Sequence, residues 1–190
     1  MAFVNQALWF ASRSSGQVSL LLLTLVAVLG ALHTGRAATR RWPRFAVHTL
    51  HHNLAVLAVA FVAVHVAAAI IDPYAGIRWA DAVVPFASTY QPFWTGLGAA
   101  AADLLLALVV SSRMRLRLPW RLWRALHFAA YVLWPVALVH GLGIGGADAS
   151  LGWVRTIDAG CALAVAAAVV VRMRARHQDT EARRVEVGLR

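Results

Sequence analysis

One stretch decides the fold of this chain: AVHTLHHNLAVLAVAFVAVHVAAAII, residues 46–71. A helix needs about 20 apolar residues to cross the hydrocarbon core of a bilayer, and this stretch exceeds that length. Leu, Val and Ala dominate it, which favours a helix over the short alternating strands of a membrane barrel. It also contains histidines. Because an ionisable ring is costly inside a bilayer, these residues indicate a functional site.

Four further apolar segments stand at residues 17–34, 93–112, 122–142 and 153–172. The whole chain is 61% hydrophobic and only 14% charged, against about 25% charged residues in a soluble domain. We therefore predict an all-α fold, a polytopic membrane helix bundle with five transmembrane helices. The single cysteine, Cys161, excludes an intrachain disulfide and a cysteine-based metal cluster, and its apolar surroundings predict a packing role.

The basic residues predict the orientation of these helices. All are arginine, and they concentrate in three places: the connection after the first segment, the connection at 113–124, and the C-terminal tail. By the positive-inside rule we expect an N-terminus outside and a C-terminus inside, in the cytoplasmic (inner) membrane. Since the arginines flank apolar segments, we expect membrane lipid and no nucleic acid as a partner. The expected divisions are an N-terminal interfacial segment (1–16), a membrane domain (17–172) and a basic cytoplasmic tail (173–190).

The second and fourth segments carry most of the histidines, and the topology makes these two helices parallel. Six of the eight histidines lie on them. They are His48, His51, His52 and His65 on the second segment and His127 and His140 on the fourth. One buried histidine is commonly a packing residue, but matched pairs at similar depths on parallel helices favour a shared function.

The spacing of these histidines sets their depths. His51 and His65 are 14 residues apart, which is about 21 Å of rise with the rings about 40° from alignment. His127 and His140 are 13 residues apart, about 19.5 Å of rise but about 140° out of register in an ideal helix. Pro135 lies between them and can kink the helix, so the ideal angle is not a guide there.

Two pairs follow from these depths: an inner pair, His51 with His127, and an outer pair, His65 with His140. Neutral imidazoles on both sides of a macrocycle can supply both axial ligands of a haem iron. His52 is the alternative inner ligand, although His51 lies nearer the face of His65.

Two arginines lie near the inner pair in the sequence. Arg44 precedes His51 by seven residues and Arg124 precedes His127 by three. Each either pairs with a propionate of the inner haem, since arginine suits carboxylates, or is an ordinary cytoplasmic anchor.

These residues resemble a known family. The run from His51-His52-Asn53-Leu54 to His65, then Asp72-Pro73-Tyr74, then Trp123-Arg124-Ala125-Leu126-His127 through His140-Gly141 is similar to the ferric reductase-like transmembrane domain. That superfamily includes ferric reductases, NADPH oxidases and the haem subunit of periplasmic methionine sulfoxide reductase. The resemblance covers about residues 17–172. It implies b-type haem between helices two and four, with ligands falling on His51, His65, His127 and His140.

The resemblance also shapes the expected function. Hydride-fed members carry a flavin and nicotinamide domain, whereas about 18 residues follow the last predicted helix here, so flavin is expected on a partner only. We expect two haems b, with one as the alternative, and electron transfer across the bilayer. The donor would be a separate flavoprotein, a quinol or an external flavin protein. The chain would then be the electron-transfer membrane component of an oxidoreductase.

Two other functions remain open from the sequence. A metal-ion or proton transporter would use the intramembrane histidines together with Asp103, a carboxylate midway along the third segment. Such a transporter predicts one cluster near the midplane, whereas the histidines lie at two levels about 20 Å apart. The third possibility is a structural subunit of a larger membrane complex.

Overall fold

The structure, a computed structural model, describes residues 2–34 and 43–188, and in these ranges it contains helices and their connections but no strand. Side chains are described for 6–32, 43 and 45–174. The elements in chain order are α1 (Ala2–Thr34), α2 (Arg44–Ile71), α3 (Trp79–Val83), α4 (Pro92–Arg113), α5 (Trp120–Phe128), α6 (Ala130–Ile144), the 3₁₀ helix η1 (Asp148–Ser150) and α7 (Gly152–Gly188).

The predicted membrane bundle is confirmed. Five helical stretches are long and apolar enough to cross a membrane: Gln6–Leu32, Phe45–Ile71, Pro92–Arg113, Trp120–Ile144 and Gly152–Arg174. The first begins well before residue 17, where the sequence placed it, because α1 is continuous from Ala2. The orientation of the bundle and the interfacial position of residues 1–16 stay predictions.

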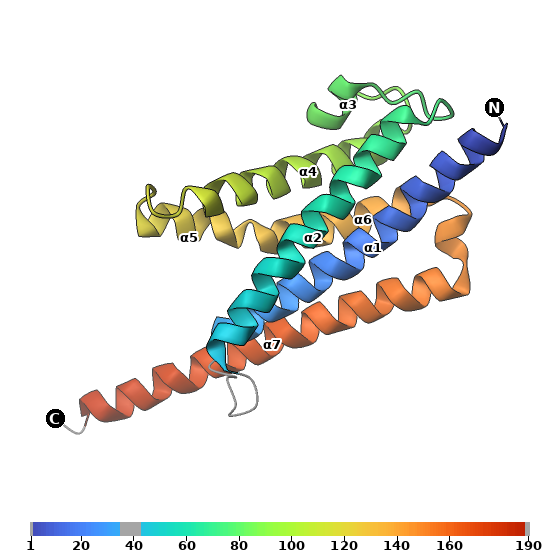
Figure 1. Cartoon of the computed structure of the whole chain (residues 1–190). Coiled ribbons are helices and arrows are strands. Elements are labelled where there is room, and N and C mark those ends of the chain that lie inside the picture. The colour runs from blue at the N-terminus through green and yellow to red at the C-terminus, as the bar shows by residue number, and fades with distance from the viewer. Residues whose placement is uncertain (1, 35–42, 189–190) are drawn as a thin grey trace.

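Helix α1 lies at the centre of the bundle (Figure 1). It packs along α2 on one side and against α7 and α6 on the other, while α4 packs against α6. The short helix α3 lies on α4 at the end of the bundle where α1 begins. The two histidine-bearing spans are the least buried of the five, and α2 packs mainly on α1.

The core joins α1, α6 and α7 through Leu20, Trp134 and Cys161. The indole Nε1 of Trp134 donates a hydrogen bond to the hydroxyl of Thr24 on α1, at 2.9 Å. Burial of this donor would be costly without an acceptor, so the bond selects how α6 is rotated against α1. Cys161 is buried, in agreement with its predicted packing role.

The fourth span is broken at Ala129, where α5 ends and α6 begins. The Ala129 N–H bonds the carbonyl of Leu126 at 2.9 Å, and the Val132 N–H bonds the carbonyl of Ala129 at 3.0 Å. These are 3₁₀-type bonds, and each such residue turns about 120° instead of 100°. Pro135 lies one turn and a half further on and displaces the carbonyl four residues before it. The extra turning per residue rotates His140 around the helix axis toward the face of His127, and so reduces the mismatch of about 140° expected for an ideal helix.

Helix α3 begins with a capping box between Arg78 and Asp81. The Asp81 carboxylate is buried, and its Oδ1 accepts a hydrogen bond from Arg78 Nη2 at 2.9 Å. Bonds from the guanidinium and from the Arg78 backbone N–H hold the pKa of Asp81 below its ordinary value. The carboxylate therefore remains charged at neutral pH and stabilises the first turn of α3.

Candidate functional site

The structure brings the four histidines together in the two pairs inferred from the sequence. The ring centroids of the inner pair, His51 and His127, are 6.5 Å apart, with 61° between the ring planes. The centroids of the outer pair, His65 and His140, are 6.2 Å apart, with 73° between the planes. In each pair, one histidine comes from α2 and the other from the broken span α5–α6.

These separations match two imidazoles on opposite sides of one metal. A ring nitrogen lies about 2.0–2.1 Å from a first-row metal that it ligates. Adding roughly 1.1 Å from nitrogen to ring centroid on each side gives about 6.3 Å between the centroids of two axial imidazoles. Both measured distances lie close to that value.

Two of the histidines are oriented by carbonyl groups of α1. Nδ1 of His51 lies 3.1 Å from the carbonyl oxygen of Val26, and Nδ1 of His65 lies 2.8 Å from that of Ser12. A carbonyl only accepts, so Nδ1 must carry the proton in both rings. The lone pair is therefore on Nε2, which is the tautomer that a metal ligand needs.

The third histidine follows the same rule on another helix. Nδ1 of His140 lies 2.8 Å from the carbonyl oxygen of Trp94 in the first turn of α4. Its Nε2 is likewise left with the lone pair.

A glycine stands four residues after each accepting carbonyl. In a helix the side chain at i+4 points back over residue i, so a side chain there would cover the carbonyl that the histidine uses. A Cβ on any of these glycines would press against the histidine ring, at 3.0 Å for Gly16 and His65, 3.3 Å for Gly30 and His51, and 2.6 Å for Gly98 and His140. The three glycines are visible in the sequence as glycines within apolar segments. Which histidine each one contacts depends on how the helices pack.

His127 is held differently from the other three. Its Nδ1 is buried and has no hydrogen-bond partner among the described residues, and the same holds for Nε1 of Trp123. Instead, the ring stacks on Trp123, with centroids 5.0 Å apart and 18° between the planes. The Arg115 guanidinium lies 5.1 Å from the centroid of the Trp123 ring. The His127 ring is therefore oriented by stacking on Trp123, whereas the other three rings are oriented by a backbone carbonyl that a glycine leaves uncovered.

The outer pair opens into a cavity of about 380 Å³. His65, His140, Gly16 and Gly98 line it among mostly apolar side chains from α1, α2, α4 and α6. A mainly apolar cavity of this size with a few polar groups is typical of cofactor sites.

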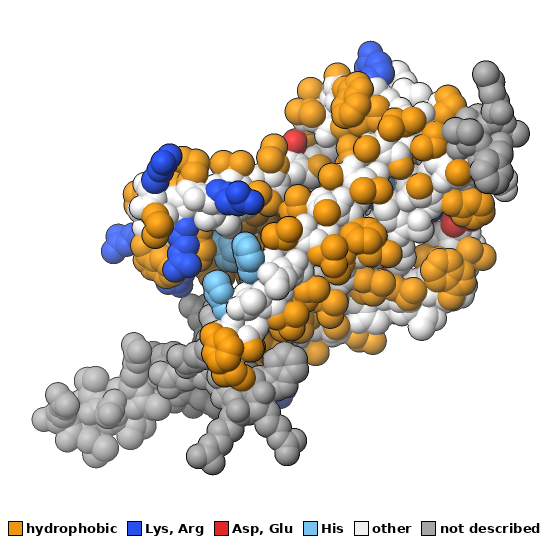
Figure 2. All heavy atoms as spheres, in the orientation of Figure 1, with side chains coloured by type: hydrophobic (Ala, Val, Ile, Leu, Met, Phe, Trp, Pro, Cys, Tyr) orange, Lys and Arg blue, Asp and Glu red, His pale blue; other side chains and the backbone are white. Residues whose placement is uncertain are grey.

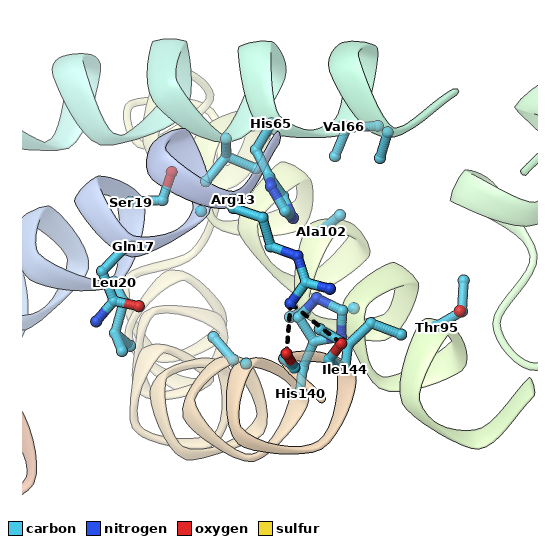
Figure 3. A pocket seen from close by; sticks show the side chains of 18 of the residues that line it. Arg13, Gln17, Ser19, Leu20, His65, Val66, Thr95, Ala102, His140 and Ile144 are labelled. Atoms are coloured by element: carbon cyan, nitrogen blue, oxygen red, sulfur yellow. Dashed lines mark hydrogen bonds between the residues drawn. The ribbon is translucent and has the colours of Figure 1, made fainter. Parts of the chain in front are cut away.

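Arg13 also lines this cavity, near the two outer histidines (Figure 3). Its Nη1 donates to the carbonyl of Gly145 at 2.8 Å and to that of Ile144 at 3.3 Å. Its Nε lies 3.8 Å from the Asp148 carboxylate. Nothing in the sequence pattern singled out this arginine, because the first span was expected to begin after it.

A buried carboxylate also reaches the cavity. Asp158 on α7 is 7% exposed, and its Oδ1 accepts a hydrogen bond from Gln17 Nε2 at 2.8 Å. Sequence reasoning singled out Asp103 on α4 instead, and Asp103 is not among the residues that line the cavity. The contact joins α1 to α7 beside the outer pair.

The remaining candidates lie near the opposite end of the bundle. The Arg124 side chain is exposed, with its guanidinium carbon 5.7 Å from the centroid of the Phe128 ring. Arg44 begins α2, but its side chain lies outside the described residues. Figure 2 shows histidine side chains exposed in a recess at this end, beside arginine side chains. The propionate role of both arginines stays a prediction.

The donor set fits a haem better than a bare metal ion. Each pair offers two imidazole nitrogens, and no group of three or more His, Cys, Asp or Glu is close enough to hold a metal in the described part of the chain. A closed structural metal site uses about four protein donors. Haem supplies its own equatorial nitrogens and needs two axial ligands, which is what each pair provides.

Comparison with protein families identifies one match. The family described as "Ferric reductase like transmembrane component" matches residues 15–138. This range contains the larger part of α1, all of α2, α3, α4 and α5, the first part of α6, and three of the four paired histidines. No similar chain was found among curated proteins or solved structures.

The glycine contacts lead to a first prediction. Gly98→Ala places a methyl group 2.6 Å from the His140 ring, so we expect haem content to fall by about one per chain, with a smaller loss for Gly30→Ala at 3.3 Å. Gly160→Ala is the matched control, because nothing lies within 4 Å of its Cβ. Haem per protein in monodisperse detergent samples is the measurement. Full haem content in Gly98→Ala would show that the glycine does not position this ring.

Proposed function

The chain belongs to the family of ferric reductase-like transmembrane components, and from this premise we propose that it carries electrons across the membrane through two b-type haems. Membership makes it a membrane electron-transfer component. The observation that supports two haems is the presence of two histidine pairs, with ring centroids 6.5 Å apart in one pair and 6.2 Å apart in the other. Each pair has the separation and the donor atoms that one iron with two axial imidazoles requires.

His51 and His127 would ligate the inner haem, and His65 and His140 the outer haem. Each haem supplies a one-electron carrier when bound. The chain's own contribution is to hold the rings. Backbone carbonyls fix the tautomer of His51, His65 and His140, whereas Trp123 stacks on His127. A ring fixed before binding loses less freedom when it ligates, which favours retention of the cofactor.

The two levels explain why a pair of haems is needed. His51 and His65 are separated by about 21 Å of helix rise, most of the about 30 Å hydrocarbon core. A carrier at each level divides the crossing into short steps. A single site near the midplane, as a transporter would use, does not account for histidines at both levels.

Arg13 adds a positive charge at the outer level. Its guanidinium lines the cavity near the outer histidines, bonded to the carbonyl of Ile144 at the end of α6 and to that of Gly145 just beyond it (Figure 3). A nearby cation favours the reduced form of a redox centre, because reduction adds negative charge. Arginine also suits a carboxylate such as a haem propionate. Both effects would hold the outer haem and raise its potential.

The donor and the location follow from the inner end. The arginines of the 113–124 region, with Arg44 and Arg124 as the proposed propionate partners, make this end basic. A basic face suits a partner with a negatively charged surface, such as a flavoprotein. A quinol, which is uncharged, would instead reach the inner level from the membrane. With the arginines inside, the N-terminus lies outside and the protein spans the cytoplasmic membrane.

The haem ligands can be tested one by one. In a reduced-minus-oxidised visible spectrum with a haem-to-protein ratio, we expect a haem b signal at about two haems per chain, set by two bis-imidazole sites. His51→Ala or His127→Ala should remove one haem, and His65→Ala or His140→Ala the other.

His52→Ala distinguishes the neighbouring alternative, since it should keep both haems if His51 is the ligand. The absence of haem from the purified protein, or an unchanged spectrum in all four ligand variants, would refute the proposal.

The role of Arg13 predicts a shift in one potential. Arg13→Gln removes the charge beside the outer pair, so the midpoint potential of one haem should fall by tens of millivolts, on the order of 30–100 mV, while the other stays near its original value. Arg155→Gln, at an exposed position near the start of α7, is the matched control. Redox titration followed at the haem band gives both values. Equal, small shifts in the two variants would argue against Arg13 acting at the outer site.

A further inference from the structure

Two histidines of α2 are not used by the pairs. His48 and His52 lie on either side of His51 in the sequence, and the side chains of both are exposed. They are four residues apart, so they stand on successive turns of the helix and only about 40° apart around it. Relative to His51, they lie about 60° and 100° around the helix on the same side. They therefore form a second histidine face, next to the one that meets His127.

Imidazoles at this spacing can chelate one metal ion. Residues at i and i+4 have Cβ atoms about 5–6 Å apart, and each metal–nitrogen bond is about 2.0–2.1 Å. The same i, i+4 spacing on one helix face binds zinc in metalloproteases. Neutral imidazole favours Zn²⁺, Cu²⁺ and Ni²⁺ over Mg²⁺ or Ca²⁺, which prefer oxygen ligands.

We propose that His48 and His52 form a binding site for a divalent transition-metal ion on the surface of α2, separate from the two haem pairs. Two side chains supply part of the coordination, and water completes it. This site lies in the first turns of α2, at the end of the bundle where histidines are exposed in a recess beside arginines (Figure 2). An ion bound there would lie beside the proposed inner haem ligand His51.

The charges around this site give it a distinctive property. None of the described acidic side chains belongs to the first turns of α2: Asp72 caps its opposite end, and the others belong to other elements, namely Asp81, Asp103, Asp148 and Asp158. The neighbouring charges at this end are arginines, which repel a cation. Salt screens such repulsion over about 10 Å at 0.1 M ionic strength. Metal binding at His48 and His52 should therefore strengthen as salt increases. Adsorption of the metal ion to anionic lipid or detergent would instead weaken, because salt screens that attraction.

Calorimetric titration of the full-length protein with Zn²⁺ tests the proposal. The protein is used as purified, with any haem that it retains, in neutral detergent and without a polyhistidine tag. We expect one ion per chain, and at least a tenfold loss of affinity in His48→Ala and in His52→Ala, because either change removes half of the chelate. Raising NaCl from 0.1 to 0.5 M should increase the affinity of the unaltered protein.

A matched variant separates chelation from histidine content. His52→Ala combined with Asn53→His keeps the number of histidines but sets the spacing at five residues, about 140° around the helix. It should bind as weakly as His52→Ala alone. If the combined variant binds like the unaltered protein, or if neither single variant weakens binding, the proposal is wrong.

The test is independent of the haem assignment, because metal binding is measured by heat and not by redox activity. If haem is absent but Zn²⁺ binds with the predicted dependence on spacing, the metal site stands and the electron-transfer proposal fails. If His52→Ala loses a haem, His52 is an iron ligand, and the metal-site assignment is overturned.

Discussion

The site depends on one repeated interaction: a histidine Nδ1–H that donates to a backbone carbonyl on a neighbouring helix. A carbonyl inside a helix already accepts an N–H from the residue four positions later, and the side chain of that residue normally covers it. Gly16, Gly30 and Gly98 leave the carbonyl open, so its second lone pair can meet an imidazole. The contact orients the ring, fixes its tautomer, and brings two helix backbones close together. Without it, an intramembrane imidazole would need another partner or would move freely.

The same interaction explains how α1 and α2 register with each other. Gly16 and Gly30 are 14 residues apart on α1, and the histidines that they face, His65 and His51, are 14 residues apart on α2. Fourteen residues are close to a whole number of turns, so both contacts lie on one side of each helix. The order is reversed, as antiparallel helices require. If α2 slid along α1 or rotated against it, both contacts would break at once. The packing of α1 on α2 therefore sets the depth of the two histidine levels.

Much of the fold was predictable, because length and hydropathy alone specify five spans. The depths and pairing of the histidines followed from the 1.5 Å rise and from the arginine pattern. The three glycine contacts were not predictable, since they depend on which helix packs beside which. The only sign of the break at Ala129 was Pro135, six residues away. The direction in which the break rotates His140 around the helix could not be predicted from the sequence. Arg13 and Asp158 were missed because each lies near the end of a span, where charged residues are ordinarily read as anchors.

The central claim is that the two histidine pairs hold two haems, which together would carry electrons from one face of the bilayer to the other. The most direct test uses proteoliposomes that contain the haem-loaded protein and trapped ferricyanide, with a membrane-impermeant reductant added outside. The account predicts that trapped ferricyanide is reduced at a rate proportional to protein, and that loss of either pair, through His51→Ala or His65→Ala, stops the transfer while the vesicles stay sealed. Reduction of both haems with no reduction of the trapped ferricyanide would contradict it, as would transfer that continues unchanged when one pair is removed.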